Sequence, residues 1–214
     1  MKNKKELNII KRDGRKELLD ISKVHKMTEA ACEGLNGVSS SEVEMNSGLQ
    51  FSDGMTTNEI QEILIKSAND LISLEAPNYQ YVAARLLLFS LQKHVFGKFV
   101  NPDAHAPLRF VVASNVERGV YDKSILDKYT DDEWNKLDSY IKHDRDLDFT
   151  YAGLRQIVDK YLVQDRSSGK IYETPQYMYM MISATLFADY PRDTRLKYVK
   201  KYYNACLLYT SDAA

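Results

Sequence analysis

The feature that most constrains the fold is an Asp-Gly dipeptide between two short runs of strand-forming residues near the start of the chain. Residues 7–12 (Leu-Asn-Ile-Ile-Lys-Arg) precede Asp13-Gly14, and residues 15–19 (Arg-Lys-Glu-Leu-Leu) follow it. Asp-Gly is the strongest short-range signal for a β-hairpin, because a type I′ turn needs positive φ at both central residues. The sequence therefore predicts an antiparallel hairpin over residues 7–19.

Four helices are predicted after this hairpin. Asp20 or Ser22 caps the first, and three serines precede a short second helix. Thr56 and Glu59 match a capping box, in which each residue satisfies a free backbone N–H of the other, at the start of the third. The fourth is expected from about residue 78 to 96 and ends at Gly97. We assign residues 1–98 to this first domain.

The second half of the chain is also predicted to be mainly helical. Thr130 and Glu133 match another capping box, and helices are expected at about 176–188 and 194–205. A second hairpin is expected where residues 161–163 and 171–172 flank the turn at 166–169. The fold class is therefore mainly α with short β-hairpins (α+β). The two domains are 1–98 and 99–205, and residues 101–107 are the expected linker.

Composition excludes several classes of protein. The chain has 214 residues and a net charge of -1, so no global field attracts nucleic acid or an anionic membrane. It has no apolar run of about 18 residues, the minimum for a transmembrane helix. Two cysteines exclude a disulfide framework and a four-cysteine zinc site. We expect a cytoplasmic protein with no metal site.

The first 26 residues carry nine Lys or Arg against four Asp or Glu, which leaves two interpretations open. A basic run is either a solvated face or a phosphate site. Lys11 and Arg12 end the first strand and point to opposite faces, so one of them can face the helices. Lys23 and Lys93 can close on the same place.

Further side chains near these cations can recognise the rest of a nucleotide. Glu17 and Asp20 offer acceptors for an adenine amino group or a hydroxyl, and Thr57 stands at a helix N-terminus with free backbone N–H groups. Neither GxxxxGK[ST] nor GxGxxG occurs, so both common phosphate-binding loops are absent. Spacing alone favours a plain basic hairpin over a nucleotide site.

Several segments resemble a known family. Residues 9–14 (Ile-Ile-Lys-Arg-Asp-Gly), 54–57 (Gly-Met-Thr-Thr) and 79–85 (Tyr-Gln-Tyr-Val-Ala-Ala-Arg) are similar to the ATP-cone of the large, catalytic subunit of aerobic class I ribonucleotide reductase. The similarity continues through residues 143–146 (His-Asp-Arg-Asp) and 171–176 (Ile-Tyr-Glu-Thr-Pro-Gln). It covers Leu7 to Ala205 and points to the bacterial and phage type of subunit.

The resemblance implies a function and a set of nucleotide contacts. The family reduces ribonucleoside diphosphates by cysteine radical chemistry, with thioredoxin or glutaredoxin as reductant. Its ATP-cone is an activity switch to which ATP or dATP binds with Mg²⁺. Lys11 and Lys93 would hold phosphates, and Glu17 with its neighbours would read the adenine side. The contacts implied for this chain are Ile9, Lys11, Arg12, Glu17, Leu18, Leu19, Asp20, Ile21, Ser22, Lys23, Thr57, Gln61 and Lys93.

One position departs from the family pattern. Gln61 stands where enterobacterial-type members have a histidine that helps the cone respond to dATP. Glutamine forms hydrogen bonds but cannot become positively charged near the phosphates. We therefore expect binding of an adenine nucleotide, but not inhibition by dATP.

The resemblance also implies what this chain lacks. In the family a ten-stranded barrel with the radical and redox cysteines follows this segment, and neither Cys32 nor Cys206 has a matching context. We expect no catalytic residue and no turnover here. The full-length enzyme would pair with a radical-generating small (β) subunit and a second copy of itself, and with neither nucleic acid nor membrane. Residues 206–214 resemble one reading frame of a transposase-type sequencing adapter, so we expect them to be non-native.

Two alternatives remain. A free-standing regulator can be built on an ATP-cone, as in transcriptional repressors that join the cone to a zinc ribbon, but those need four cysteines ahead of the cone. The other alternative is a purely structural helical module whose cone binds nothing.

Overall fold

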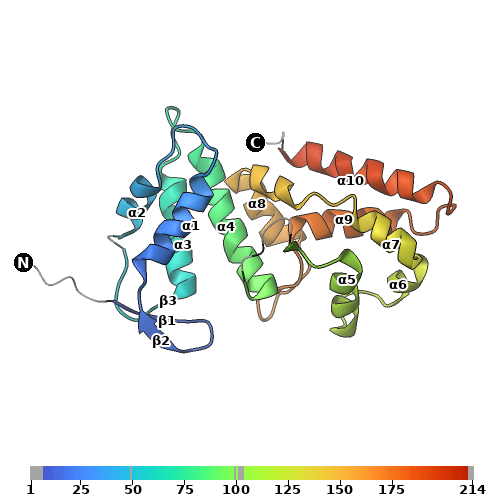
Figure 1. Cartoon of the computed structure of the whole chain (residues 1–214), viewed down its shortest axis with the longest axis horizontal. Coiled ribbons are helices and arrows are strands. Elements are labelled where there is room, and N and C mark those ends of the chain that lie inside the picture. The colour runs from blue at the N-terminus through green and yellow to red at the C-terminus, as the bar shows by residue number, and fades with distance from the viewer. Residues whose placement is uncertain (1–6, 49, 99, 101–103, 212–214) are drawn as a thin grey trace, which may run out of the picture. The chain divides into compact units, whose positions relative to one another are not determined.

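The chain folds into two compact units (Figure 1). The structure is a computed structural model that describes residues 7–48, 50–98, 100 and 104–211. The first unit comprises the residues up to Ser90 together with Thr150–Arg155, and the second comprises Leu91–Phe149 and the residues from Gln156 onward. The mainly α class with short strands is confirmed. The exact domain ranges 1–98 and 99–205 stay a prediction.

The first unit begins with a small sheet in the order β2-β1-β3. β1 (Asn8–Ile10) pairs antiparallel with β2 (Lys16–Leu18), which places Ile9 opposite Glu17. β1 also pairs in parallel with β3 (Met55–Thr56), a strand that the sequence did not predict. A strand of two residues is too short to show any periodicity.

The hairpin is confirmed, but its predicted type I′ turn is wrong. Among the described residues only glycines have positive φ, so Asp13 does not adopt the conformation that type I′ requires at that position. Instead, the Gly14 N–H donates to the Lys11 carbonyl at 2.9 Å, and Gly14 has a φ of 83°. This is the three-residue loop in which a type I turn is followed by a left-handed glycine.

Four helices follow in the first unit, and the predicted caps are confirmed. They are α1 (Ile21–Cys32), α2 (Ser40–Gly48), α3 (Thr57–Asp70) and α4 (Tyr79–Phe96), of which α4 continues into the second unit. Asp20 caps α1, and Thr56 with Glu59 forms the capping box of α3. The core of the unit includes Ala31, Val43 and Leu64, which are completely buried.

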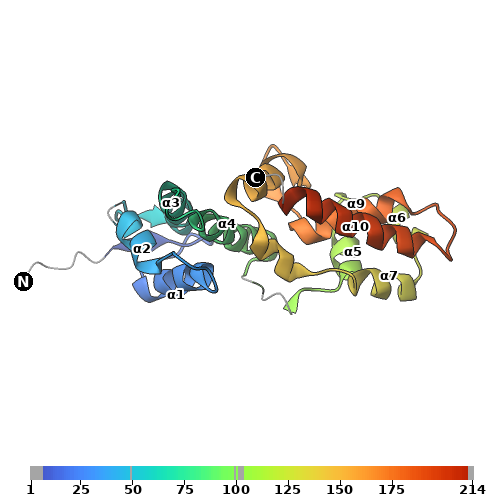
Figure 2. The same ribbon diagram turned by 90° about the horizontal axis from the view of Figure 1, so that it is seen from above.

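The second unit is also mainly helical. Its elements are α5 (Leu108–Glu117), α6 (Ser124–Lys128), α7 (Asp131–Asp138), the 3₁₀ helix η2 (His143–Asp148), the π-helix η3 (Ile157–Tyr161), β4 (Gln164–Asp165), β5 (Lys170–Ile171), α9 (Pro175–Leu186) and α10 (Arg195–Ser211). The short helix α8 (Tyr151–Gln156) belongs almost wholly to the first unit. α9 and α10 lie side by side (Figure 2).

The second hairpin is present, but its first strand lies later than predicted. The π-helix occupies residues as far as Tyr161, so the paired strands are β4 and β5. The predicted linker falls partly on residues 101–103, which lie outside the described residues. The helix α5, directly after it, was not predicted.

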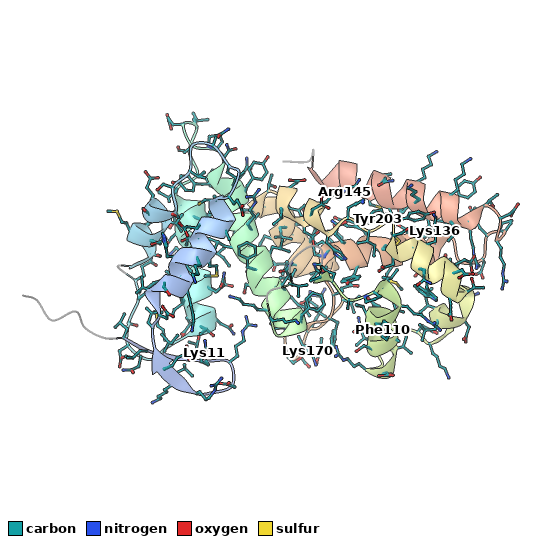
Figure 3. All side chains as sticks on the ribbon, in the orientation of Figure 1. Lys11, Phe110, Lys136, Arg145, Lys170 and Tyr203 are labelled. Atoms are coloured by element: carbon teal, nitrogen blue, oxygen red, sulfur yellow. The ribbon has the colours of Figure 1, made fainter. Side chains whose placement is uncertain are left out.

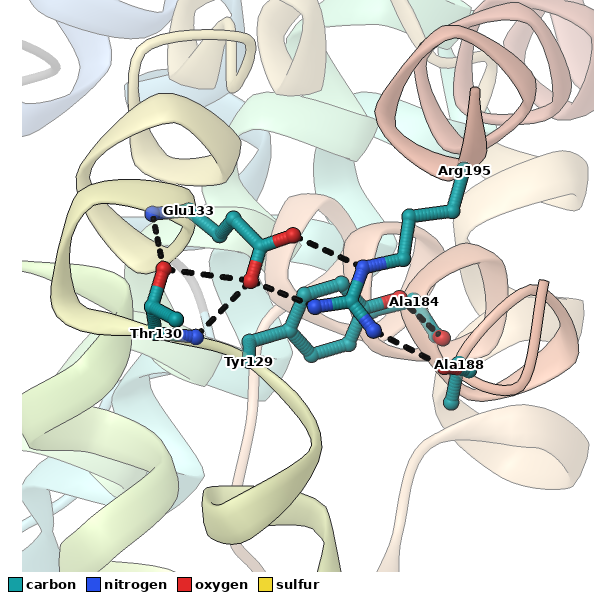
Figure 4. Close-up of polar contacts among 6 residues, drawn as sticks. All are labelled: Tyr129, Thr130, Glu133, Ala184, Ala188 and Arg195. Atoms are coloured by element: carbon teal, nitrogen blue, oxygen red, sulfur yellow. Dashed lines mark hydrogen bonds and ion pairs between the residues drawn. The ribbon is translucent and has the colours of Figure 1, made fainter. Parts of the chain in front are cut away.

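A buried ion pair joins α7 to α10 (Figure 4). The Arg195 Nε donates to Glu133 Oε1 at 2.8 Å, and its Nη2 donates to Oε2. The same Glu133 carboxylate accepts the Thr130 N–H at 2.8 Å as part of the capping box of α7. Arg195 also donates to the Ala188 carbonyl beyond the end of α9 and lies over the Tyr129 ring at 4.4 Å. One arginine therefore satisfies groups from three neighbouring segments.

A second buried polar chain runs from η2 through α9 to α10. The Gln176 Nε2 donates to Asp146 Oδ1 at 2.8 Å, and the Tyr203 hydroxyl donates to the Gln176 amide oxygen. Complete burial raises the pKa of Asp146 to about 8. At neutral pH this carboxyl is therefore largely protonated, which reduces the cost of burying it.

Two half-buried histidines stack in the second unit. The rings of His105 and His143 lie 3.6 Å apart, nearly parallel, and the His143 ring lies 4.9 Å from that of Tyr177. Among the described residues neither Nδ1 atom has a hydrogen-bond partner. Burial lowers the pKa of His105 to about 4 and that of His143 to about 3. Both rings are therefore neutral at pH 7.

This pair predicts a loss of stability in acid. Because folding lowers both pKa values from about 6.5, the unfolded chain binds more protons below that pH. The contribution of the two neutral histidines to the free energy of unfolding is complete above pH 6.5 and decreases as pH falls from 6.5 towards 4. In a His143→Phe variant, which keeps the stacking but cannot titrate, the unfolding free energy should fall less over this interval. Denaturation followed by fluorescence of Trp134 measures it, and equal slopes for both proteins would contradict the prediction.

Candidate nucleotide site

The hairpin turns three predicted site residues to one face. Ile9 and Glu17 are cross-strand partners, and Lys11 lies two residues after Ile9, so alternation sends all three side chains the same way. Ile9 is buried. The Lys11 Nζ lies 3.0 Å from Glu17 Oε1 (Figure 3 labels Lys11 at the hairpin). Three of the predicted site residues, Ile9, Lys11 and Glu17, therefore share one face of the hairpin.

The start of α1 adds a second cation and a second carboxylate. The Lys23 Nζ lies 3.9 Å from Glu17 Oε1, the same oxygen that Lys11 approaches, and 3.7 Å from Asp20 Oδ2. Asp20 accepts hydrogen bonds from the Ser22 hydroxyl at 2.6 Å and the Ser22 N–H at 3.0 Å, which hold its pKa below the ordinary value. We call Lys11, Glu17, Asp20 and Lys23 the Glu17 cluster.

Arg12 has a different partner from Lys11, and it lies in the turn of the hairpin rather than in β1. Its Nε donates to Asn58 Oδ1 at 2.9 Å in the first turn of α3, next to Thr57. Partial burial lowers the pKa of this guanidinium. Sequence reasoning missed Asn58, because its contact with Arg12 depends on the pairing of β1 with β3. Arg12 and Thr57 therefore mark the N-terminus of α3, apart from the Glu17 cluster.

The other predicted contacts are distributed differently. Gln61 is buried in α3, and its amide donates to the Leu86 carbonyl in α4 at 3.0 Å. Leu18 and Ile21 are exposed, whereas Leu19 is half-buried and donates its N–H to the Leu7 carbonyl. Lys93 lies in α4 within the second unit, so its membership of the site stays a prediction.

The Glu17 cluster fits a phosphate. Ammonium groups bind phosphate oxygens by charge-assisted hydrogen bonds. Because Lys11 and Lys23 approach one oxygen of Glu17, a phosphate oxygen near that point can reach both. The N-terminus of α1 begins immediately beside it and favours negative charge. The carboxylates of Glu17 and Asp20 offer acceptors for hydroxyl and amino groups, or ligands for Mg²⁺.

Comparison with known proteins identifies the two domains in which these residues lie. The ATP cone domain family matches residues 7–94, and the all-alpha domain of ribonucleotide reductase matches residues 147–208. The chain is 49% identical over 199 residues to ribonucleoside-diphosphate reductase 1 subunit alpha of Salmonella typhimurium and 47% identical over 199 residues to that of Escherichia coli. The chain therefore carries the ATP cone domain and the all-alpha domain of ribonucleotide reductase.

The similarity to this reductase family extends to a viral member. The alpha subunit of Enterobacteria phage T4 is 44% identical over 201 residues. Each of these three alignments covers 93% of this chain but 26% of the relative, so the chain spans about a quarter of the length of the curated relatives it matches. That quarter holds the ATP-cone and the all-alpha domain.

Neither cysteine of this chain has a lowered pKa. Cys32 and Cys206 are both half-buried thiols. Burial raises the pKa of Cys32 to about 11 and also raises that of Cys206, so both stay protonated at neutral pH. The described part of the chain contains no group of three or more His, Cys, Asp or Glu placed to hold a metal ion. None of its helices is long and apolar enough to cross a bilayer.

Proposed function

We propose that this chain is the effector-binding part of a ribonucleoside-diphosphate reductase alpha subunit and that its first domain, residues 1–98, binds ATP or dATP with Mg²⁺. The whole protein would reduce ribonucleoside diphosphates to deoxyribonucleoside diphosphates in the cytoplasm, with thioredoxin or glutaredoxin as reductant. It would act with a radical-generating β subunit and a second alpha subunit. The supporting observation is the convergence of Lys11 and Lys23 on one oxygen, within a segment that matches the ATP cone domain.

The two halves of the effector would contact different parts of the site. Lys11 and Lys93 are proposed to hold the phosphates, and Lys23 adds a charge beside them. Glu17 and Asp20, with the backbone around Ser22, are proposed to recognise the adenine and ribose groups. The remaining proposed contacts are Ile9, Arg12, Leu18, Leu19, Ile21, Thr57 and Gln61.

Gln61 supports a narrower proposal about dATP. Its amide is buried, uncharged and hydrogen-bonded to the Leu86 carbonyl. It therefore supplies no titratable charge that could respond to the phosphates or to the missing 2′-hydroxyl. We propose that dATP binds to this cone without inhibiting the whole enzyme.

Calorimetric titration with ATP and with dATP, each with Mg²⁺, tests the proposed function. We expect the chain to bind both nucleotides and Lys11→Ala to weaken ATP binding about ten- to hundredfold, because a charge-assisted hydrogen bond contributes about 1.5–3 kcal/mol. Lys16→Ala is the control, since Lys16 is exposed and alternates to the other face of the hairpin. No binding of either nucleotide at millimolar concentration would leave only a structural role for this domain.

A further inference from the structure

The lysines of the Glu17 cluster are already paired with an anion. Lys11 and Lys23 lie 3.0 Å and 3.9 Å from the same oxygen of Glu17. The side chains of Lys11 and Glu17 are 30% and 35% exposed, so their pair is partly shielded from solvent, whereas Lys23 is 66% exposed. The backbone of Glu17 is fixed by its pairing with β1, which places its side chain on the face of the hairpin that carries Lys11.

A carboxylate oxygen and a phosphate oxygen interact with an ammonium group in the same way. Both accept its N–H groups, and both are negative, so they repel one another when they approach the same cation. The Glu17 carboxylate offsets one of the two positive charges of these lysines, and Asp20, 3.7 Å from the Lys23 Nζ, offsets the other. A phosphate that enters between Lys11 and Lys23 must therefore displace this carboxylate or share the lysines with it.

We propose that Glu17 is a built-in counter-ion of the nucleotide site, which orients Lys11 and Lys23 and competes with the phosphates of the effector for them. This inference rests on the proposed nucleotide binding and adds a regulatory role for one residue. Competition favours ligands with the greatest phosphate charge, because only these offset the loss of the Glu17 ion pairs.

Inorganic tripolyphosphate is the probe that isolates this competition, because it carries the charge of the triphosphate without the base and the ribose. Titration of the Glu17→Gln chain measures the effect of removing the carboxylate charge at nearly constant shape. Asp13→Asn is the matched control: it removes one negative charge from the same hairpin, but Asp13 pairs with Arg15 at 2.7 Å and has no ion pair with Lys11 or Lys23. Far-UV circular dichroism checks that each variant is folded, and Glu17→Ala replaces Glu17→Gln if the latter is not.

We expect Glu17→Gln to bind tripolyphosphate about fivefold more tightly than the unmodified chain at low salt, with a smaller gain at high salt, as for other partly exposed ion pairs. Asp13→Asn should change the affinity much less. A folded Glu17 variant whose affinity is unchanged or weaker, or one that binds no tripolyphosphate, overturns the counter-ion role even if the unmodified chain binds ATP. Failure of the unmodified chain to bind ATP overturns the proposed function itself, so the two failures are distinguishable.

Discussion

Replacement of Arg195 by alanine should lower the free energy of unfolding of the second unit by about 3–5 kcal/mol, the usual cost of breaking a buried ion pair by removing one partner. The side chains of Arg195 and Glu133 are only 4% and 12% exposed, so little solvent can replace the lost contacts. The substitution would leave the Glu133 carboxylate and the Ala188 carbonyl without their guanidinium donor. Burial by itself raises the pKa of Glu133, and the hydrogen bonds from Arg195 help to hold it below the ordinary value. The variant would therefore contain a buried charge that has lost its partner.

The fluorescence of Trp134 is a direct measure of this effect. It is the single tryptophan of the chain, it is 1% exposed, and it follows Glu133 in α7. Guanidinium denaturation followed at this residue reports the unfolding of the second unit. Arg109→Ala is the matched control, because Arg109 also pairs with a carboxylate of α7, that of Asp131, but the side chains are 51% and 71% exposed. Its cost should be about 0–1 kcal/mol. Similar losses in both variants would show that burial of the Arg195 pair does not matter.

Leu64→Ala is expected to destabilise the first unit by about 2–5 kcal/mol. Leu64 lies in α3, seven residues after Thr57, and is completely buried. Alanine removes most of its apolar surface and leaves a cavity that neighbouring helices can fill only in part. Because the same helix begins at Thr57, loss of this packing should also weaken nucleotide binding by the domain.

The measurement is the helical circular dichroism signal during denaturation, with Trp134 fluorescence recorded in parallel. Leu64→Ala should shift the part of the dichroism transition that belongs to the first unit more than it shifts the tryptophan transition. Leu74→Ala provides the control, because Leu74 is 97% exposed and its replacement should cost less than about 0.5 kcal/mol. Equal effects of the two substitutions would contradict the assignment of Leu64 to the core.

The parts of the fold that could be predicted from sequence are those set by neighbouring residues. The capping boxes at Thr56 and Thr130 were predicted and are present, because each involves residues three positions apart. The Asp-Gly turn was located correctly, but its loop type depends on where the strand pairing ends, and an Asp-Gly dipeptide does not determine that. The predicted position of the first strand of the second hairpin was wrong for a similar reason, since the π-helix that ends at Tyr161 has no recognisable sequence signal.

The same distinction between local and long-range contacts applies to the candidate site. Alternation along the first hairpin predicts that Lys11 and Arg12 lie on different faces. The structure has Lys11 near Glu17 and Arg12 near Asn58, although Arg12 lies in the turn and not in the strand. The partner of Arg12 could not be predicted, because it lies 46 residues away and depends on the two-residue strand β3. The contact between Arg195 and Glu133 spans 62 residues and likewise has no local pattern.

The central position of β1 has a consequence for which changes in length the chain can accept. β1 is bonded on both sides, to β2 over three residues and to β3 over two, and Lys11 follows directly after it. A shift of one residue in this pairing would exchange the two faces, turning Lys11 away from Glu17 and bringing Arg12 to its place. Substitutions at exposed positions of the hairpin leave that geometry intact. Insertion or deletion of a single residue between Asn8 and Lys11 does not, so the length of this segment is more tightly constrained than the identity of its exposed residues.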